Sequence, residues 1–188
     1  MRDVFVTGAD GFAGGPLCEM LGQRGFRVTG VGLRPDVAPK NYAYHTLDIM
    51  DDDRLNTLLC DVRPEMVFHL AAISSTQIAE RSLHHAARLN TLAVVNLMRF
   101  CAEVSPESTV VLFSTGEVYG PNRDLNSPHT EESPVAEPLN FYTATKIAQE
   151  AYAKILAKTL SLSLIILRLF SMTGPGPVSY THLTLPTN

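Results

Sequence analysis

A tyrosine and a lysine lie four positions apart, at Tyr142 and Lys146, in the segment NFYTATKIAQEAYAK. Four residues are slightly more than one helical turn, so in a helix the two side chains share a face. A phenol with an ordinary pKa of about 10 is too weakly acidic to act as a base at neutral pH, and a nearby ammonium group stabilises the phenolate. Lowering that pKa to about 7 requires the phenolate to be stabilised over the phenol by roughly 4 kcal/mol. The pair is either a proton-transfer site or a surface pair on an amphipathic helix.

Three glycines, Gly8, Gly11 and Gly14, follow the first apolar run of the chain in TGADGFAGG. Glycines at a strand-to-helix turn let the backbone approach a pyrophosphate, and the helix N-terminus adds partial positive charge. The alternative is an ordinary glycine-rich turn. Because the glycines come directly after the first strand, the spacing favours a dinucleotide site.

The end of the second strand bears on the choice between NAD and NADP. A carboxylate there would hold the ribose hydroxyls of NAD. This chain has Gly32 at that position and Arg34 two residues later. An arginine without a competing carboxylate favours a 2′-phosphate, so for an NAD(P) cofactor the sequence slightly favours NADP. The alternative is that Arg34 is a solvated loop residue.

Strand-like and helical runs alternate along the chain. The apolar pattern predicts strands at 3–8, 26–32, 41–49, 65–72, 108–115 and 162–170, and helices at 15–25, 51–62, 76–103 and 142–160. Such alternation predicts an α/β protein with a Rossmann-type, doubly wound parallel sheet and helices on both faces. The carboxylates of 51–53 oppose a helix dipole, so we expect a helix start there rather than a metal site.

Composition excludes several classes of protein. The chain has 188 residues, 45% of them hydrophobic, and a formal net charge of −4, which fits one globular domain. The acidic balance argues against a nucleic-acid surface, and no apolar run reaches membrane-spanning length. Cys18, Cys60 and Cys101 are odd in number and widely spaced, which is typical of reduced thiols in a cytoplasmic protein. The histidines have no ligand spacing, so we expect no metal.

Six motifs occur in a fixed order: T-G-x-x-G-x-x-G at 7–14, LDI at 47–49, HLAA at 69–72, STGEVYG at 114–120, Y-x-x-x-K at 142–146 and RLFSMTGPG at 168–176. Together they resemble the extended short-chain dehydrogenase/reductases of the NAD-dependent epimerase/dehydratase type. These enzymes modify nucleotide sugars as epimerases, 4,6-dehydratases, decarboxylases or 4-keto reductases. The resemblance covers residues 1–177.

The resemblance implies a catalytic set. Tyr142 would take a proton from a sugar hydroxyl while hydride leaves the sugar C4 for the nicotinamide, and Lys146 would also hold the nicotinamide ribose. Thr115 would hydrogen-bond the reacting oxygen. Glu117 is either a base that removes the proton next to a new ketone, as in dehydratases, or a loop-capping acid. Epimerases often have a small or neutral residue there, so the subtype stays open.

The resemblance also implies the cofactor contacts. The pyrophosphate turn contains the three glycines, Asp48 and Ile49 flank the adenine, and Asn90 supports the lysine through the helix backbone or a water. Ala71 and Ala72 let the cofactor pass close to the fourth strand. The implied cofactor-binding residues are Gly8, Asp10, Gly11, Phe12, Gly14, Arg34, Asp48, Ile49, Leu70, Ala71, Ala72, Asn90, Tyr142 and Lys146.

The domain expectation is one cofactor-binding domain with the catalytic residues at 1–177. The last eleven residues, VSYTHLTLPTN, read as the translation of a sequencing adapter, so we expect 178–188 to be non-native and the C-terminal substrate domain to be missing. By resemblance, the parent protein would be a homodimer that acts on a nucleotide sugar. The alternative is a non-catalytic, regulatory Rossmann protein that binds a dinucleotide. Such proteins commonly lose the tyrosine–lysine pair.

Overall fold

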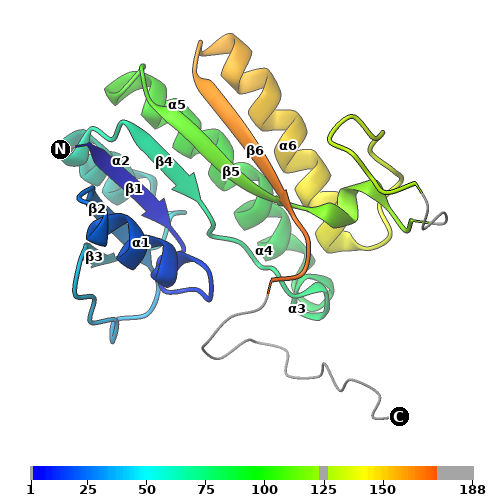
Figure 1. Cartoon of the computed structure of the whole chain (residues 1–188), viewed down its shortest axis with the longest axis horizontal. Coiled ribbons are helices and arrows are strands. Elements are labelled where there is room, and N and C mark those ends of the chain that lie inside the picture. The colour runs from blue at the N-terminus through cyan, green and yellow to red at the C-terminus, as the bar shows by residue number, and fades with distance from the viewer. Residues whose placement is uncertain (1, 123–126, 173–188) are drawn as a thin grey trace.

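Six parallel strands form one sheet in the order β3-β2-β1-β4-β5-β6 (Figure 1). The computed structural model describes residues 2–122 and 127–172. The strand order reverses at β1 and β4, as in a doubly wound Rossmann sheet, which confirms the predicted fold class. The strands are β1 (Asp3–Thr7), β2 (Arg27–Gly32), β3 (Ala43–Thr46), β4 (Met66–His69), β5 (Thr109–Thr115) and β6 (Ser163–Leu169).

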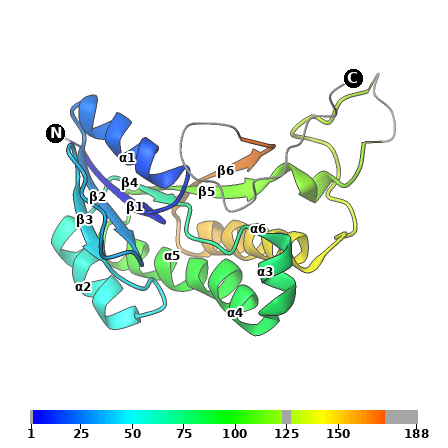
Figure 2. The same cartoon turned by 90° about the horizontal axis from the view of Figure 1, so that it is seen from below.

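Helices cover both faces of the sheet, as predicted. Helix α1 (Gly14–Gln23) packs on β1 and β2 from one side, and α2, α5 and α6 lie on the other side (Figure 2). The second layer is made by α2 (Asp52–Val62), α3 (Thr76–Arg81), α4 (Leu83–Ala87), the π-helical turn η1 (Arg88–Leu92), α5 (Ala93–Val104) and α6 (Phe141–Thr159). A short 3₁₀ turn, η2 (Gly116–Tyr119), follows β5.

The alternation of side chains along the central strands separates two cores. Phe5 of β1 faces the large core with Leu55 of α2 and Leu97 of α5. Val4 and Val6 face the opposite way, into a smaller core under α1. A strand with apolar side chains on both faces is typical of a buried parallel sheet, because both of its surfaces are covered by helices.

The two faces are covered unequally at β6. Leu164 and Ile166 pack into the core on the α6 side, whereas Ile165 points the other way and is 48% exposed. Phe170, just after the strand, is 66% exposed. Among the described residues, no helix covers this part of the sheet opposite α6, so apolar side chains of β6 lie at the surface.

Three elements differ from the sequence prediction, and one of them is the fourth strand, which runs only over Met66–His69 instead of 65–72. The helical segment predicted at 76–103 is broken at Ser82, whose backbone leaves the helical region, and it contains the π-helical turn η1. The third strand runs only over Ala43–Thr46. The helix start predicted at 51–53 is confirmed, because the Asp51 side chain caps α2 by accepting a hydrogen bond from the backbone N–H of Arg54 (3.2 Å). The predicted adapter segment 178–188 lies outside the described residues.

None of the described helices has the length and apolar character needed to cross a membrane.

Adjacent leucines on α2 test the large core. Leu59 is completely buried, whereas Leu58 is only partly buried. We expect Leu59→Ala to lower the free energy of unfolding by about 2–5 kcal/mol, since it removes packed methyl groups and leaves a cavity. Leu58→Ala should cost clearly less. Urea unfolding followed by circular dichroism measures both, and equal losses would contradict the assigned core.

Candidate active site

Helix α6 carries the tyrosine–lysine pair and is anchored at its first turn. The Asn140 side chain caps the helix by accepting from the backbone N–H of Thr143 at 2.8 Å. Tyr142 is 9% exposed and packs with Ala79 of α3 and Ala86 of α4. The cap and this packing fix the N-terminal end of α6 beside the sheet.

Lys146 is buried between α6 and β5, with only 4% of its surface exposed. Its ammonium group donates to the carbonyl oxygen of Phe113 at 2.6 Å and to Oε1 of Gln149 at 2.8 Å. Burial lowers the pKa of Lys146 to about 8, while the negative charge of Glu150 acts in the opposite direction. Lys146 therefore still carries its charge at neutral pH, one turn from Tyr142.

Asn90 joins the tyrosine–lysine helix to the loop after β4. Its Oδ1 accepts from the N–H of Ile73 at 2.8 Å, and its Nδ2 donates to the carbonyl of Ile73 and to Oγ1 of Thr145. Thr145 in turn donates to the carbonyl oxygen of Tyr142 at 2.7 Å. Asn90 lies in the π-helical turn η1, and such turns are frequent at functional sites. Asn90 thus bridges the loop after β4 to Thr145, the residue before Lys146, and its predicted support of the lysine stays a prediction.

Thr115 and Glu117 lie at the carboxyl end of β5. Thr115 is the last strand residue, two positions after the Phe113 carbonyl that holds Lys146, and its hydroxyl accepts from the N–H of Glu117 at 3.2 Å. The Glu117 carboxylate accepts from the Thr143 hydroxyl at 2.8 Å and from Asn140 at 3.4 Å. Glu117 is exposed and bound to the first turn of α6.

A buried histidine connects the ends of β1 and β4. His69 is 1% exposed, and its Nδ1 lies 2.8 Å from the hydroxyl oxygen of Thr7. Burial, together with the charge of Lys146, lowers the pKa of His69 to about 3, so its imidazole is neutral. The same Thr7 oxygen accepts from the N–H of Ala71 at 3.2 Å. These bonds set the position of the loop after β4 relative to the glycine turn.

Sequence reasoning missed the partners that hold α6 against β5 and β6. Glu150, 3% exposed, accepts from the Ser114 hydroxyl at 2.6 Å and from the Arg168 guanidinium at 2.9 and 2.7 Å. Burial raises the pKa of Glu150, but the hydrogen bonds from Arg168 and Ser114 outweigh it and lower that pKa overall. Gln149 was also missed. Its only signal was the polar pair of Gln149 and Glu150, which lies three and four positions after Lys146 on the same helix.

The glycine turn is tight enough to require glycine. A side chain at Gly14 would overlap the carbonyl oxygen of Gly8, and one at Gly8 would lie 2.8 Å from the backbone nitrogen of Ala71. Gly8 also has a positive φ of 72°. The backbone between β1 and α1 therefore has no side chain at these glycines and lies close to the β4 loop. This arrangement fits a dinucleotide that passes along the carboxyl ends of these strands.

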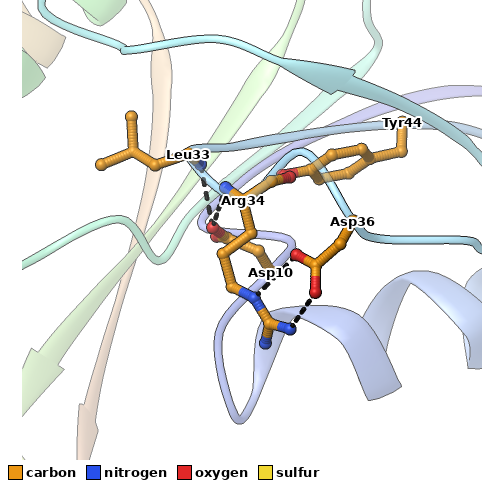
Figure 3. A network of polar contacts seen from close by, with 5 residues as sticks. All are labelled: Asp10, Leu33, Arg34, Asp36 and Tyr44. Carbon is orange, nitrogen blue, oxygen red and sulfur yellow. Dashed lines mark hydrogen bonds and ion pairs between the residues drawn. The ribbon is translucent and has the colours of Figure 1, made fainter.

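The other predicted cofactor residues lie in the glycine turn itself or in the segments that follow β2, β3 and β4. Ile49 is buried in the large core, whereas Asp48 is exposed and its carboxylate accepts from the N–H of Met50 at 2.9 Å. Arg34 and Asp10 meet beyond the end of β2 (Figure 3). Gly11 is exposed, and Phe12, Leu70, Ala71 and Ala72 are half-buried.

These features define a Rossmann-fold protein with a tyrosine–lysine site at the carboxyl edge of its sheet. A family model described as the NAD dependent epimerase/dehydratase family matches residues 4–185. The chain belongs to this family, in agreement with the resemblance drawn from its motifs.

Relatives within the family are nucleotide-sugar epimerases. UDP-glucuronate 4-epimerase 4 of Arabidopsis thaliana is 32% identical over 185 residues, which cover 92% of this chain and 42% of the relative. UDP-glucose 4-epimerase of Thermotoga maritima, solved with UDP-glucose, has a TM-score of 0.80 at 26% identity and covers 89% of this chain. The Thermus thermophilus UDP-glucose 4-epimerase in complex with NAD has a TM-score of 0.80 at 27% identity and also covers 89% of this chain.

The chain spans about half the length of the relatives it matches, 42% of the Arabidopsis protein and 55% and 54% of the two solved structures.

Two neighbouring glycines test the turn. We expect Gly14→Ala to lower the free energy of unfolding by about 1–3 kcal/mol and to weaken dinucleotide binding, because its Cβ overlaps the Gly8 carbonyl. At Gly15 the nearest atom to an added Cβ is the Ala9 carbonyl oxygen at 3.3 Å, a tight contact that a small shift relieves, so Gly15→Ala should cost clearly less than Gly14→Ala. Urea unfolding and calorimetric titration with ADP-ribose measure both effects. Similar losses in the two variants would contradict the geometry of the turn.

The buried ammonium group predicts a pH dependence of stability. Unfolding returns the pKa of Lys146 from about 8 to its ordinary value of about 10.4. Between these pH values the unfolded chain keeps a proton on Lys146 that the folded chain has released, so Lys146 by itself contributes a rise of the free energy of unfolding with pH, by at most roughly 3 kcal/mol. The buried thiols of Cys18 and Cys101, whose pKa burial raises to about 12, act in the opposite direction above about pH 9, so the Lys146 contribution is obtained as the difference between the wild type and the variant. Lys146→Met should remove this rise. Lys158→Met, which removes an exposed lysine of the same helix, should leave it in place. Unfolding curves from pH 7 to 11 provide the measurement.

Proposed function

We propose that the protein is an NAD(P)-dependent UDP-sugar 4-epimerase, with Tyr142 as the acid/base. The observation that carries the proposal is the charged, buried Lys146 one helical turn from Tyr142, held by the carbonyl of Phe113 on the strand that ends at Thr115. Family membership supports this assignment, as do relatives whose names specify 4-epimerisation of UDP-glucuronate and UDP-glucose.

Each residue of the set has a chemical role in this proposal. The positive charge of Lys146 stabilises the phenolate of Tyr142, which takes the proton of the sugar C4 hydroxyl and later returns it. The hydroxyl of Thr115 hydrogen-bonds the same oxygen and fixes its position. When bound, NAD(P) supplies a reversible hydride acceptor, so that C4 can lose and regain hydrogen on opposite faces. The turn at 8–14 and the loop at 70–72 would hold the cofactor.

The surroundings of Glu117 favour epimerisation over dehydration. A dehydratase base must reach the carbon next to the new ketone, yet this carboxylate accepts hydrogen bonds from Thr143 and Asn140 at the start of α6. We propose that Glu117 acts as a positioning residue for the helix of Tyr142. Its catalytic role, inferred from the resemblance, stays a prediction that Glu117→Gln would test through product identity.

The assembly and location of the protein are part of the same proposal. Leu92 of η1 and Ile155 of α6 are 48% and 64% exposed, and apolar side chains on these helices support a homodimer built through them. Cys18, Cys60 and Cys101 are free thiols, which supports a cytoplasmic protein.

Replacing Tyr142 by phenylalanine tests the proposed chemistry. We expect Tyr142→Phe to lower kcat for 4-epimerisation of UDP-glucose or UDP-glucuronate by about 10²–10⁴-fold, the usual contribution of a general acid–base. Binding of ADP-ribose, which lacks the nicotinamide, should be unchanged. Product formation measured by NMR gives the rate.

Tyr152→Phe is the matched control, since Tyr152 lies on the same helix and is 47% exposed. It should retain wild-type turnover. Equal turnover in the Tyr142 variant and the wild type would reject the mechanism. Dinucleotide binding with no turnover of any UDP-, GDP- or dTDP-sugar by the wild type would instead favour the regulatory alternative.

A further inference from the structure

Two neighbouring polar residues of α6, Gln149 and Glu150, lie inside the protein and bind different partners. Consecutive residues of a helix point about 100° apart, so their side chains leave the helix in different directions. Gln149 is completely buried, and its Oε1 accepts a hydrogen bond from the ammonium group of Lys146 at 2.8 Å. Glu150 is 3% exposed and binds Ser114 of β5 and Arg168 of β6. The amide therefore contacts the ammonium group, and the acid contacts the guanidinium group.

The carboxylate of Glu150 is bonded to cations other than Lys146. It accepts hydrogen bonds from Arg168 at 2.9 and 2.7 Å and from Lys154 at 3.3 Å. Among the described residues, Lys146 forms no ion pair, so the charge of Glu150 acts on it only through space. The groups that accept hydrogen bonds from the ammonium group are a backbone carbonyl and the Gln149 amide, and both are neutral.

The oxygen of the Gln149 amide is the part of this side chain that the fold uses. Its Nε2 is buried and donates to no residue in the part of the chain that the structure describes. The amide cannot be turned over, because an ammonium group only donates and therefore requires the oxygen. An apolar side chain would fill the same space without a buried donor. The contribution of Gln149 is thus to accept one hydrogen bond from a buried cation.

A carboxylate at position 149 would bind Lys146 more strongly, but it would also compensate the charge. Glutamate has the same length as glutamine, and its hydrogen bond to an ammonium group is charge-assisted. The resulting ion pair would weaken the field that Lys146 exerts on Tyr142, one turn earlier on the helix. A neutral acceptor holds the ammonium group without this loss.

The other titratable groups near Lys146 do not compensate its charge either. Burial and the charge of Lys146 lower the pKa of His69 on β4 to about 3, so this imidazole is neutral. Burial raises the pKa of Cys101 on α5 to about 12, so this thiol is neutral as well. The charged side chains of α3, α4, η1, η2 and α5, which surround α6, are exposed.

We propose that Gln149 is a positioning residue of the tyrosine–lysine site, which fixes the Lys146 ammonium group with a neutral oxygen and leaves its charge to act on Tyr142. The inference rests on the acid/base role of Tyr142 in the proposed function. The order of the two polar residues is essential, because the acid lies one position further along the helix, where it binds Arg168 instead of Lys146.

The ionisation of Tyr142 tests the proposal without substrate or turnover. The ultraviolet absorbance of tyrosinate is followed against pH in each chain with and without Tyr142→Phe, and the difference is the titration of Tyr142. We expect Gln149→Glu to move the midpoint up by about one pH unit, which means about tenfold less phenolate at a given lower pH. Ala151→Glu is the matched control, since it adds the same charge at an exposed position of the same helix. Water and salt screen that charge, so the midpoint should move by less than about 0.3 unit.

The pH dependence of stability measures whether residue 149 controls the charge of Lys146. The Lys146 contribution is the difference in the free energy of unfolding between each chain and the same chain with Lys146→Met. In Gln149→Glu the ion pair keeps Lys146 protonated in the folded chain, so the rise between about pH 8 and about pH 10.4 should disappear. In Gln149→Met, which has no oxygen for the ammonium group, the rise should begin at a lower pH. Each variant is informative without the other.

Two results would overturn the proposal. An equal Tyr142 midpoint in Gln149→Glu and the wild type would show that the neutrality of residue 149 does not affect the phenol. A Lys146 contribution with the same pH dependence in all three chains would show that residue 149 only fills space. Either result, with a wild-type midpoint below the ordinary value of about 10, leaves the acid/base role of Tyr142 in place. A wild-type midpoint at that ordinary value would reject both proposals.

Discussion

The position of α6 depends on one constraint, the burial of the Lys146 ammonium group against β5. An amine taken out of water must recover its hydrogen bonds inside the protein, because an unpaired buried charge is costly. The carbonyl of Phe113 and the side chain of Gln149 supply two of these bonds, and Glu150 adds a compensating negative charge. Gln149 and Glu150 lie on α6, and Phe113 lies on β5. Shifting α6 along β5 would therefore break the hydrogen bond between Lys146 and Phe113.

A second constraint, the common edge at which parallel strands end, connects the tyrosine–lysine pair to the glycine turn. Parallel strands end at one edge of the sheet, so the residues that follow β1, β4 and β5 lie close together even though they are far apart in sequence. Thr7 contacts His69 and Ala71, and Asn90 contacts Ile73 and Thr145, which together tie the glycine turn, the β4 loop and α6 to one another. A neutral His69 is required here, since a second cation near Lys146 would raise the cost of burial.

Periodicity and glycine spacing were enough to predict the parallel sheet, its helices and the tyrosine–lysine pair, because these depend on neighbours within one turn or one strand. The break at Ser82, the π-helical turn at Asn90 and the ion pair of Glu150 with Arg168 were not predictable in this way. Each depends on which side chains meet between separate segments, and no local pattern encodes that. Ile49 is a further example. The LDI motif implied that it flanks the adenine, but the motif did not predict that Ile49 is buried in the large core.

The end of β2 shows that the residue at a motif position does not by itself determine which charge lies there in the folded protein. The strand lacks an acid in its sequence, yet the space beside it contains the carboxylate of Asp10. That arrangement is possible only while residue 32 has no side chain, so the two positions are coupled: an acid introduced at Gly32 would displace Asp10 from its backbone donors instead of adding to its charge. The charge at this edge of the sheet is therefore set by residues 10 and 32 together, and neither position alone describes it.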